Sequence, residues 1–155
     1  MAKMNKDKLQ ATTNGNIETV VGSVDLHNGA PIALGDALFA TDEHELEVME
    51  AVVPSATKEV LIVGAPEFYY DETKDQLDFV TPTGETMIAY HMTTGDKVTI
   101  EQTHFAVTPT KGAIVTGGAN YKYVVNDGTA RTTFIVEALT TIGWDARPAA
   151  RIRVL

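Results

Sequence analysis

Cysteine is missing from this sequence of 155 residues. Its absence excludes disulfide bonds, thiolate metal sites and cysteine nucleophiles. No run of about 18 apolar residues occurs, so we expect no helix that crosses a membrane. The first residues contain no apolar stretch of signal-peptide length, which argues against secretion by that route. The 44% of hydrophobic residues is nevertheless enough for the core of one domain.

Basic residues are also scarce, and the formal net charge is −9. Residues 1–13 carry three lysines against one aspartate, whereas residues 36–85 carry 13 acidic and two basic side chains. From Arg131 to the end, four arginines stand against two carboxylates. The acidic middle repels phosphate backbones, so we expect no nucleic-acid partner. The basic ends suit an acidic protein surface, where charge complementarity speeds docking and sets its register.

The residue pattern predicts β-structure through most of the chain. Many threonines stand beside Val, Ile, Tyr or Phe, which favours strands over helices. Residues 59–63 form a short apolar run that is typical of a strand buried on both faces. The predicted strands are residues 17–24, 59–63, 97–101, 121–125, 132–137 and 151–155. Residues 41–53 fit either a helix capped by Thr41-Asp42 or a strand, and the β context on both sides favours the strand.

Turn signals separate these segments at short intervals. Three have an Asn-Gly or Asp-Gly pair, which supplies the positive φ of a tight turn, and three more contain glycine next to aspartate or glycine. They are Asn14-Gly15, Asn28-Gly29, Asp127-Gly128, Gly35-Asp36, Gly95-Asp96 and Gly117-Gly118. The chain therefore predicts an all-β fold, a single β-sandwich or β-barrel-like domain over residues 14–155. Residues 1–13 have little apolar content and are predicted to be a flexible, basic N-terminal arm.

The histidines do not have the spacing of a metal site. They are His27, His44, His91 and His104. No two of them stand four residues apart, so no helical pair of ligands is predicted. An acidic group, Asp71, Glu72, Asp75 and Asp78, lacks the glycine and the bidentate glutamate of a calcium loop, and a solvated turn is expected there.

No catalytic constellation is predicted either. The only serines, Ser23 and Ser55, are not in a nucleophile elbow, and Gly112 and Gly117-Gly118 lack the ending of a phosphate loop. We therefore expect a protein that is not an enzyme, without cofactor, metal ion or catalytic residue.

The aromatic residues allow a binding role. Phe68-Tyr69-Tyr70 would point to alternate faces of a strand, so at least one ring is expected in the core, and a stacking platform for sugars is the alternative. Trp144 is predicted to fill the core, with an interface anchor as the alternative.

Two segments resemble a known class of protein. Residues 61–72, LIVGAPEFYYDE, are followed by residues 89–100, AYHMTTGDKVTI. Residues 22–29, leading to Leu34-Gly35, add a strand, a turn and a short strand. This order resembles the small structural proteins encoded beside the major capsid gene in tailed phages and prophages. The resemblance spans roughly residues 17–137.

The resemblance implies a head decoration, or cement, protein. Such a protein would bind the major capsid protein on the outer surface of the virion after synthesis in the host cytoplasm; a second copy of itself is an additional candidate partner. The expected capsid contacts are Lys3, Lys6, Lys8, Arg151 and Arg153. The alternatives are a carbohydrate-binding module on the virion surface and a structural protein of the tail or neck.

Overall fold

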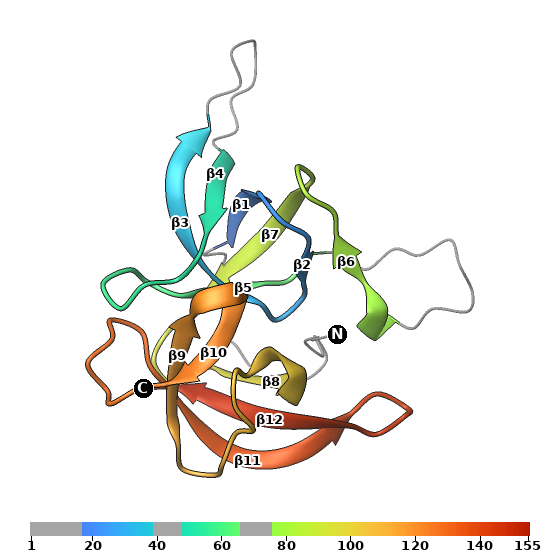
Figure 1. Cartoon of the computed structure of the whole chain (residues 1–155), viewed down its shortest axis with the longest axis vertical. Helices are drawn as coiled ribbons and strands as arrows, with labels where there is room; N and C mark the ends of the chain where they lie inside the picture. The colour runs from blue at the N-terminus through green and yellow to red at the C-terminus, as the bar shows by residue number, and fades with distance from the viewer. Residues whose placement is uncertain (1–16, 39–47, 66–75) are drawn as a thin grey trace.

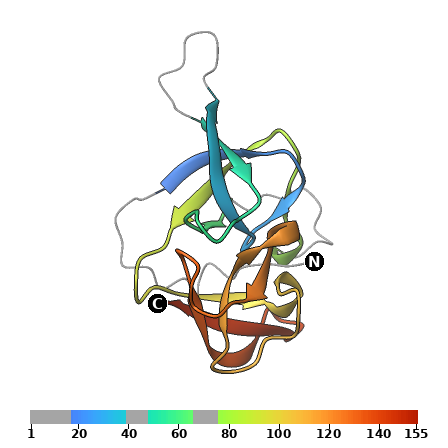
Figure 2. The ribbon, with the colours of Figure 1, turned by 60° about the vertical axis from the view of Figure 1, so that its left-hand side comes forward.

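The computed structural model describes residues 17–38, 48–65 and 76–155, and strands dominate it. Two bodies of strands lie against each other, a closed five-stranded barrel and a five-stranded sheet (Figure 1). The turned view keeps the barrel above the sheet (Figure 2). The helices of the described residues are three single turns of 3₁₀ helix, η2 (Gln76–Asp78), η3 (Gln102–His104) and η4 (Ala119–Tyr121). The all-β prediction is confirmed.

The barrel is built by the first half of the chain in the strand order β1-β4-β3-β5-β7. The strand β1 pairs with β4 in parallel and with β7 in antiparallel fashion, and this second pairing closes the barrel. A separate ribbon pairs β2 with β6. The strands are β1 (Ile17–Gly22), β2 (Leu26–His27), β3 (Pro31–Leu38), β4 (Val48–Val52), β5 (Leu61–Val63), β6 (Val80–Thr81) and β7 (Thr86–His91).

The second half of the chain forms an antiparallel sheet, here called the C-terminal sheet, in the order β10-β9-β11-β12-β8. Its two longest strands form a hairpin whose turn projects from the body, at the right of Figure 1. The strands are β8 (Lys97–Glu101), β9 (Ile114–Gly118), β10 (Lys122–Val125), β11 (Phe134–Ile142) and β12 (Arg147–Val154).

Strand β5 belongs to both bodies. Leu61 and Val63 lie in the core of the barrel, whereas Ile62 lies in the core between the barrel and the C-terminal sheet. Alternate side chains of a strand point to opposite faces, so one short strand serves two cores. All three residues are buried, which confirms the prediction of a strand buried on both faces.

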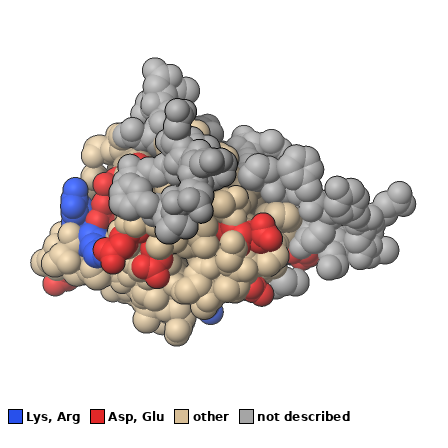
Figure 3. All heavy atoms as spheres, turned by 90° about the horizontal axis from the view of Figure 1, so that it is seen from above, with Lys and Arg blue, Asp and Glu red and all other residues tan. Residues whose placement is uncertain are grey.

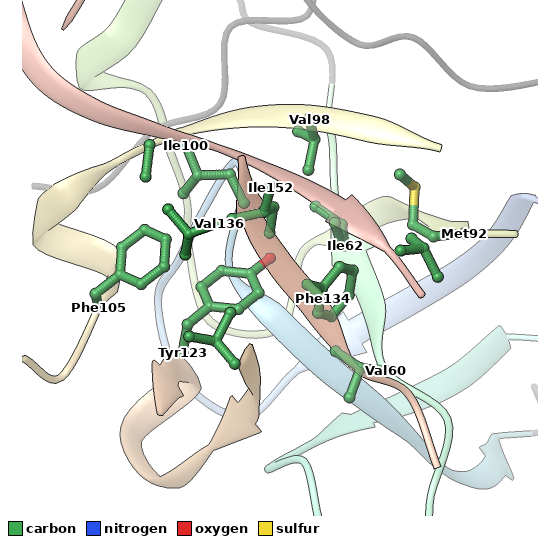
Figure 4. Packing of buried hydrophobic residues seen from close by; sticks show 13 residues of the cluster. Val60, Ile62, Met92, Val98, Ile100, Phe105, Tyr123, Phe134, Val136 and Ile152 are labelled. Carbon is green, nitrogen blue, oxygen red and sulfur yellow. The ribbon is translucent and has the colours of Figure 1, made fainter. Parts of the chain in front are cut away.

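Aromatic rings fill much of the core between the two bodies (Figure 4). The ring centroids of Phe105 and Tyr123 are 5.2 Å apart, and those of Tyr123 and Phe134 are 5.7 Å apart in an edge-to-face arrangement. The Tyr123 hydroxyl donates a hydrogen bond to the Gly29 carbonyl oxygen, 3.2 Å away across the junction. Burial raises the pKa of Tyr123, which keeps this hydroxyl a donor.

Close backbone contact and hydrogen bonds complete the junction. A Cβ atom on Gly117 of β9 would lie 2.8 Å from ring carbons of Pro54 and 3.1 Å from Pro31 of the barrel. The Val60 amide donates to the Thr132 hydroxyl over 3.1 Å. The two bodies therefore touch over a surface that leaves no room for a side chain at Gly117.

Two predicted turns lie inside strands instead. Gly35-Asp36 is within β3, at a register shift against β4, and Gly117-Gly118 ends β9. These predictions were wrong because glycine also marks a bulge or a close approach of two backbones. The turns at Asn28-Gly29, Gly95-Asp96 and Asp127-Gly128 are confirmed, each with its glycine at a φ above +90°.

The ambiguous segment is a strand where it can be seen. Residues 48–52 form β4, which confirms the preference for a strand, and residues 39–47 lie outside the described residues. The predicted arm, residues 1–13, and the turn at Asn14-Gly15 also lie outside them.

One histidine links three parts of the barrel wall. The His91 ring, at the end of β7, has its Nδ1 atom 2.9 Å from a Glu59 carboxylate oxygen and its Nε2 atom 3.2 Å from one of Glu18. Burial acts to lower the pKa of His91, but hydrogen bonds and charges from Glu59 and Glu18 outweigh it. The pKa is therefore raised above its ordinary value of 6.5.

This arrangement predicts a pH-dependent contribution to stability. A histidine whose pKa is raised by folding stabilises the fold fully below its unfolded pKa, and the contribution disappears as pH rises through the folded pKa. Below pH 6.5 the free energy of unfolding of the wild type is expected to exceed that of His91→Gln by about 1 kcal/mol, and the difference should shrink as the pH rises. The effect is small because solvent screens the partly exposed carboxylates. Urea unfolding across this pH range measures it. An NMR titration that gave His91 a pKa at or below 6.5 would contradict the assignment.

Candidate protein-interaction surface

Those candidate metal ligands that the structure describes do not converge. Among residues 17–38, 48–65 and 76–155, no three His, Asp or Glu side chains are arranged to hold a metal ion. His91 contacts Glu59 and Glu18 through opposite ring nitrogens. In this arrangement the imidazole and the two carboxylates do not face a common point at which they could bind one metal ion. Within the same ranges, no helix has both the length and the apolar character needed to cross a bilayer.

Part of the predicted chemistry lies outside the described residues. This applies to the lysines of the arm, Lys3, Lys6 and Lys8, to the aromatic run at residues 68–70, and to His44, Asp71, Glu72 and Asp75. Asp78, the last member of the acidic group, is described, and its carboxylate forms an ion pair with Arg147 over 3.2 Å.

The two predicted C-terminal contacts, Arg151 and Arg153, lie together on β12. Their Nε atoms are 3.3 Å and 2.8 Å from Glu137 carboxylate oxygens, and Lys97 of β8 is 3.3 Å from the same group. We call these four residues the Glu137 cluster. It contains three cations and one carboxylate, so it keeps an excess of positive charge, and both arginines are partly exposed.

A β-bulge creates this cluster. The register between β11 and β12 shifts between Val136 and Ala138, so Glu137 is the extra residue, and its carboxylate faces β12 and β8. Bulges commonly redirect a side chain in this way. Desolvation acts to raise the pKa of Glu137, but hydrogen bonds and charges from Lys97 and Arg153 outweigh it and lower the pKa, so the carboxylate stays ionised.

Trp144 lies in the turn between β11 and β12 and is 88% exposed, so its predicted place in the core was wrong. The buried position of this segment belongs to Ile142, which packs with Leu77 and Ala149. Gly143 and Ala146 then reverse the chain with φ values of 75° and 54°, and Trp144 falls between them. A turn position has no sheet face to bury a side chain against, and this overrides the general preference of tryptophan for the core.

An ion network holds the tip of this hairpin. The Arg147 guanidinium donates a hydrogen bond to Asp145 in the turn and lies 3.2 Å from Asp78 of η2 and 4.0 Å from Glu101 of β8. The Asp145 hydrogen bond, helped by Asp78, raises the pKa of Arg147 against an opposing effect of desolvation. The turn is therefore tied to two other elements of the fold.

The hairpin also exposes apolar side chains on one face of its strands. The β11–β12 register puts Leu139, Thr141 and Pro148 on one face of the ribbon, and Leu139 is 51% exposed. We call residues 138–149 the Trp144 hairpin. Full burial of an indole of about 200 Å² would contribute on the order of 5 kcal/mol before the costs of association. In the sequence, only Gly143 indicates a turn at this position, and no pattern predicts that Trp144 is exposed.

A second candidate site is a small cleft of mixed polarity where the barrel meets the C-terminal sheet. Its volume is about 260 Å³, and its walls include His27, His104 and Lys122. Asn120 and Tyr121, which also line it, have φ values of 57° and 54°, and such backbone strain often occurs at functional positions. The mixed charge of its walls does not select one ligand class.

Comparisons with models of protein families, with curated proteins and with solved structures find no match to this chain. The described parts of the segments that carry the resemblance to phage head proteins, residues 61–65 and 89–100, are neighbours in the fold. Leu61–Val63 pairs with β7, with Leu61 opposite His91. In the turn that follows, the Asp96 carboxylate accepts hydrogen bonds from the amide and hydroxyl of Thr93 at 2.9 and 3.0 Å. These contacts hold two strands of the barrel together and shape the turn that leads from β7 to β8, which is a structural role.

Proposed function

We propose that this protein decorates a phage capsid, binding the outer surface of the major capsid shell and stabilising it. The observation that carries the proposal is the Trp144 hairpin, which presents a largely exposed indole on a fixed turn. Large aromatic side chains on a rigid support are the usual anchors of protein interfaces. The phage head resemblance supplies the partner, and the described strands of its two segments, β5 and β7, pair with each other in the barrel.

The distribution of charge supports a defined orientation on that partner. Residues 17–96 carry 16 acidic and two basic side chains, whereas residues 97–155 carry seven basic and four acidic ones. Seen from the barrel end, acidic side chains cover more of the visible described surface than basic ones do (Figure 3). The C-terminal sheet would face an acidic shell, with the barrel directed away.

Stabilisation follows from mass action. A ligand that binds the assembled shell and not its separated subunits raises the stability of the assembly. Contacts with more than one subunit add the effect of a high effective concentration.

The proposal predicts that adding the protein to undecorated shells of its cognate major capsid protein raises their melting temperature in a saturable way. Removing residues 1–13 is expected to reduce occupancy, since three lysines are lost from an arm that would meet an acidic surface. Calorimetry and co-sedimentation measure both effects. Saturable binding of the wild type without a rise in the melting temperature of the shell would argue against a cement role. If the chain without residues 1–13 occupied the shell as fully as the wild type, the arm would have no part in binding.

Trp144 also favours a second candidate, a carbohydrate-binding module on the virion surface, because an exposed indole can stack on a sugar ring. A glycan array tests it directly. A tail or neck position is the third candidate, and electron microscopy of the assembled particle separates it from a position on the head.

A further inference from the structure

We infer that the cleft between the barrel and the C-terminal sheet binds one ring of a neutral sugar. The inference goes beyond the decoration function, and the residues that line the cleft are not those of the Trp144 hairpin. The charge of the walls alone does not select a ligand, but the rigidity and size of the cleft and the hydrogen-bonding groups of its walls do.

The two halves of the chain form opposite walls of the cleft, and two contacts fix these walls relative to each other. The Nε2 atom of His104, in η3, donates a hydrogen bond to the Asn28 carbonyl oxygen over 3.1 Å. The rings of His27 and His104 lie edge to face, with their centroids 6.4 Å apart. The cleft therefore has its shape before a ligand arrives, which lowers the cost of binding.

The volume of the cleft, about 260 Å³, limits the size of its ligand. Sites for drug-sized molecules usually measure about 300–1,000 Å³. The cleft is thus suited to one small ring, either free or as the end unit of a longer glycan.

The charges of the walls favour a ligand without net charge. With the histidines counted as neutral, the described lining residues carry one carboxylate, on Asp25, and one ammonium group, on Lys122. The Thr83 amide and hydroxyl donate hydrogen bonds to Asp25 over 2.8 and 2.9 Å and lower the pKa of its carboxyl group, so it stays ionised. Both charged side chains are exposed, so solvent weakens any ion pair that a charged ligand would form with them.

The hydrogen-bonding groups of the walls suit a ligand with several hydroxyl groups. The Thr103 hydroxyl and the Asn120 amide each donate and accept, whereas Asp25 only accepts and Lys122 only donates. A sugar hydroxyl is both a donor and an acceptor, so it can pair with any of these groups. A sugar ring presents such hydroxyls in several directions at once.

The cleft also offers apolar surface to the carbon–hydrogen face of a sugar. Leu26 and Ala30, which line it, belong to the core of the barrel, and Tyr121 packs against the same core. Tyrosine combines a broad apolar ring with a polar hydroxyl, which suits a ligand that is polar at its edge and apolar on its face.

The backbone that carries two of the lining residues is strained. Asn120 and Tyr121 have φ values of 57° and 54°, in the left-handed region. Asparagine tolerates this region, but a bulky residue such as tyrosine rarely adopts it. Such strain persists where the surrounding fold imposes it, and it is found often at ligand sites. Here it places two neighbouring residues at the cleft.

The test is a titration of the isotope-labelled, full-length protein followed by NMR. The probes are methyl α-glucoside, methyl α-galactoside and N-acetylglucosamine. Each is added to about 50 mM, several times the dissociation constant of about 1–10 mM that is expected for one ring. At least one probe should shift the amide signals of residues 25–30, 103–104 and 120–122 in a saturable way.

Two variants in the cleft and two outside it show where the sugar binds. Asn120→Gly should weaken binding about fivefold, and Tyr121→Ala about tenfold or more. Glycine adopts the left-handed region without strain, so Asn120→Gly is expected to keep the fold. Val125→Ala is the matched control, because Val125 is 70% exposed on β10 and does not line the cleft. Both Val125→Ala and Trp144→Ala should bind the sugar like the wild type.

The absence of any shift at these amides, or shifts that both cleft variants leave unchanged, overturns the sugar site. Shifts that disappear in Trp144→Ala and not in the cleft variants assign the sugar to the indole and overturn it as well. If the amino acid glycine or sodium sulfate shifts these amides and the sugars do not, the ligand is a zwitterion or an anion and the inference is wrong. Each of these results leaves the decoration function standing, since that function is measured separately by the melting temperature of the shell.

Discussion

Replacing Ile62 with alanine is expected to lower the free energy of unfolding by about 3 kcal/mol, within the usual range of 2–5 kcal/mol for a fully buried isoleucine. Ile62 is completely buried in the core between the two bodies, while its neighbours Leu61 and Val63 are buried in the barrel. A cavity at Ile62 weakens the packing of β5 against the C-terminal sheet. Because the same strand closes part of the barrel, the loss is expected within one cooperative transition.

Urea unfolding followed by far-ultraviolet circular dichroism and by the near-ultraviolet signal of the tyrosines measures this effect. Ile17→Ala removes the same atoms from a position of β1 that is 48% exposed, and it should cost less than about 1 kcal/mol. Two separate transitions in Ile62→Ala would show that the barrel and the C-terminal sheet unfold independently, contrary to the shared strand. An equal cost in the two variants would contradict the burial of Ile62.

Introducing a single methyl group at Gly117 is expected to destabilise the protein by about 2 kcal/mol. The new Cβ atom would meet two ring carbons of Pro54 at 2.8 Å, a distance that real contacts do not adopt. Proline is rigid, so relief requires β9 to move away from the barrel. That movement would loosen the aromatic packing around Tyr123, the partner of Gly117 on β10.

A double-mutant cycle tests this reason specifically. Pro54→Gly removes the clashing atoms and, alone, costs stability through the added freedom of the unfolded chain. Gly117→Ala should then cost much less in the Pro54→Gly background than in the wild type, giving a coupling energy of about 1 kcal/mol or more. Strictly additive effects would show that the close contact with Pro54 is not the cause.

Strand β5 shows what composition and pattern can predict. Its run of apolar residues between polar ones is too short for a helix and does not alternate, and both properties favour a strand covered on two sides. The Asn-Gly and Asp-Gly turns were equally accessible, because the positive φ that they require is a property of single residues. These elements could be predicted because they depend on residues that are close together in the sequence.

The interaction surface could not be predicted, because it depends on contacts between distant segments. The Glu137 cluster requires a bulge in β11 and the pairing of β12 with β8, which no local pattern announces. Trp144 is exposed because Ile142 takes the buried position and the chain then turns. Similarly, Gly117 was assigned to a turn because the proline on the other side of the junction is 63 positions earlier in the chain.

The double role of β5 also sets an order of events while the chain is being made. The ribosome completes β7, the last strand of the barrel, when residue 91 has been synthesised. The outward-facing Ile62 still lacks its partners at that point, because β8, β11 and β12 follow later. A chain that still lacks β12 therefore exposes an apolar face that invites aggregation. Truncation within the last strand should for this reason reduce soluble yield far more than the number of residues removed would suggest.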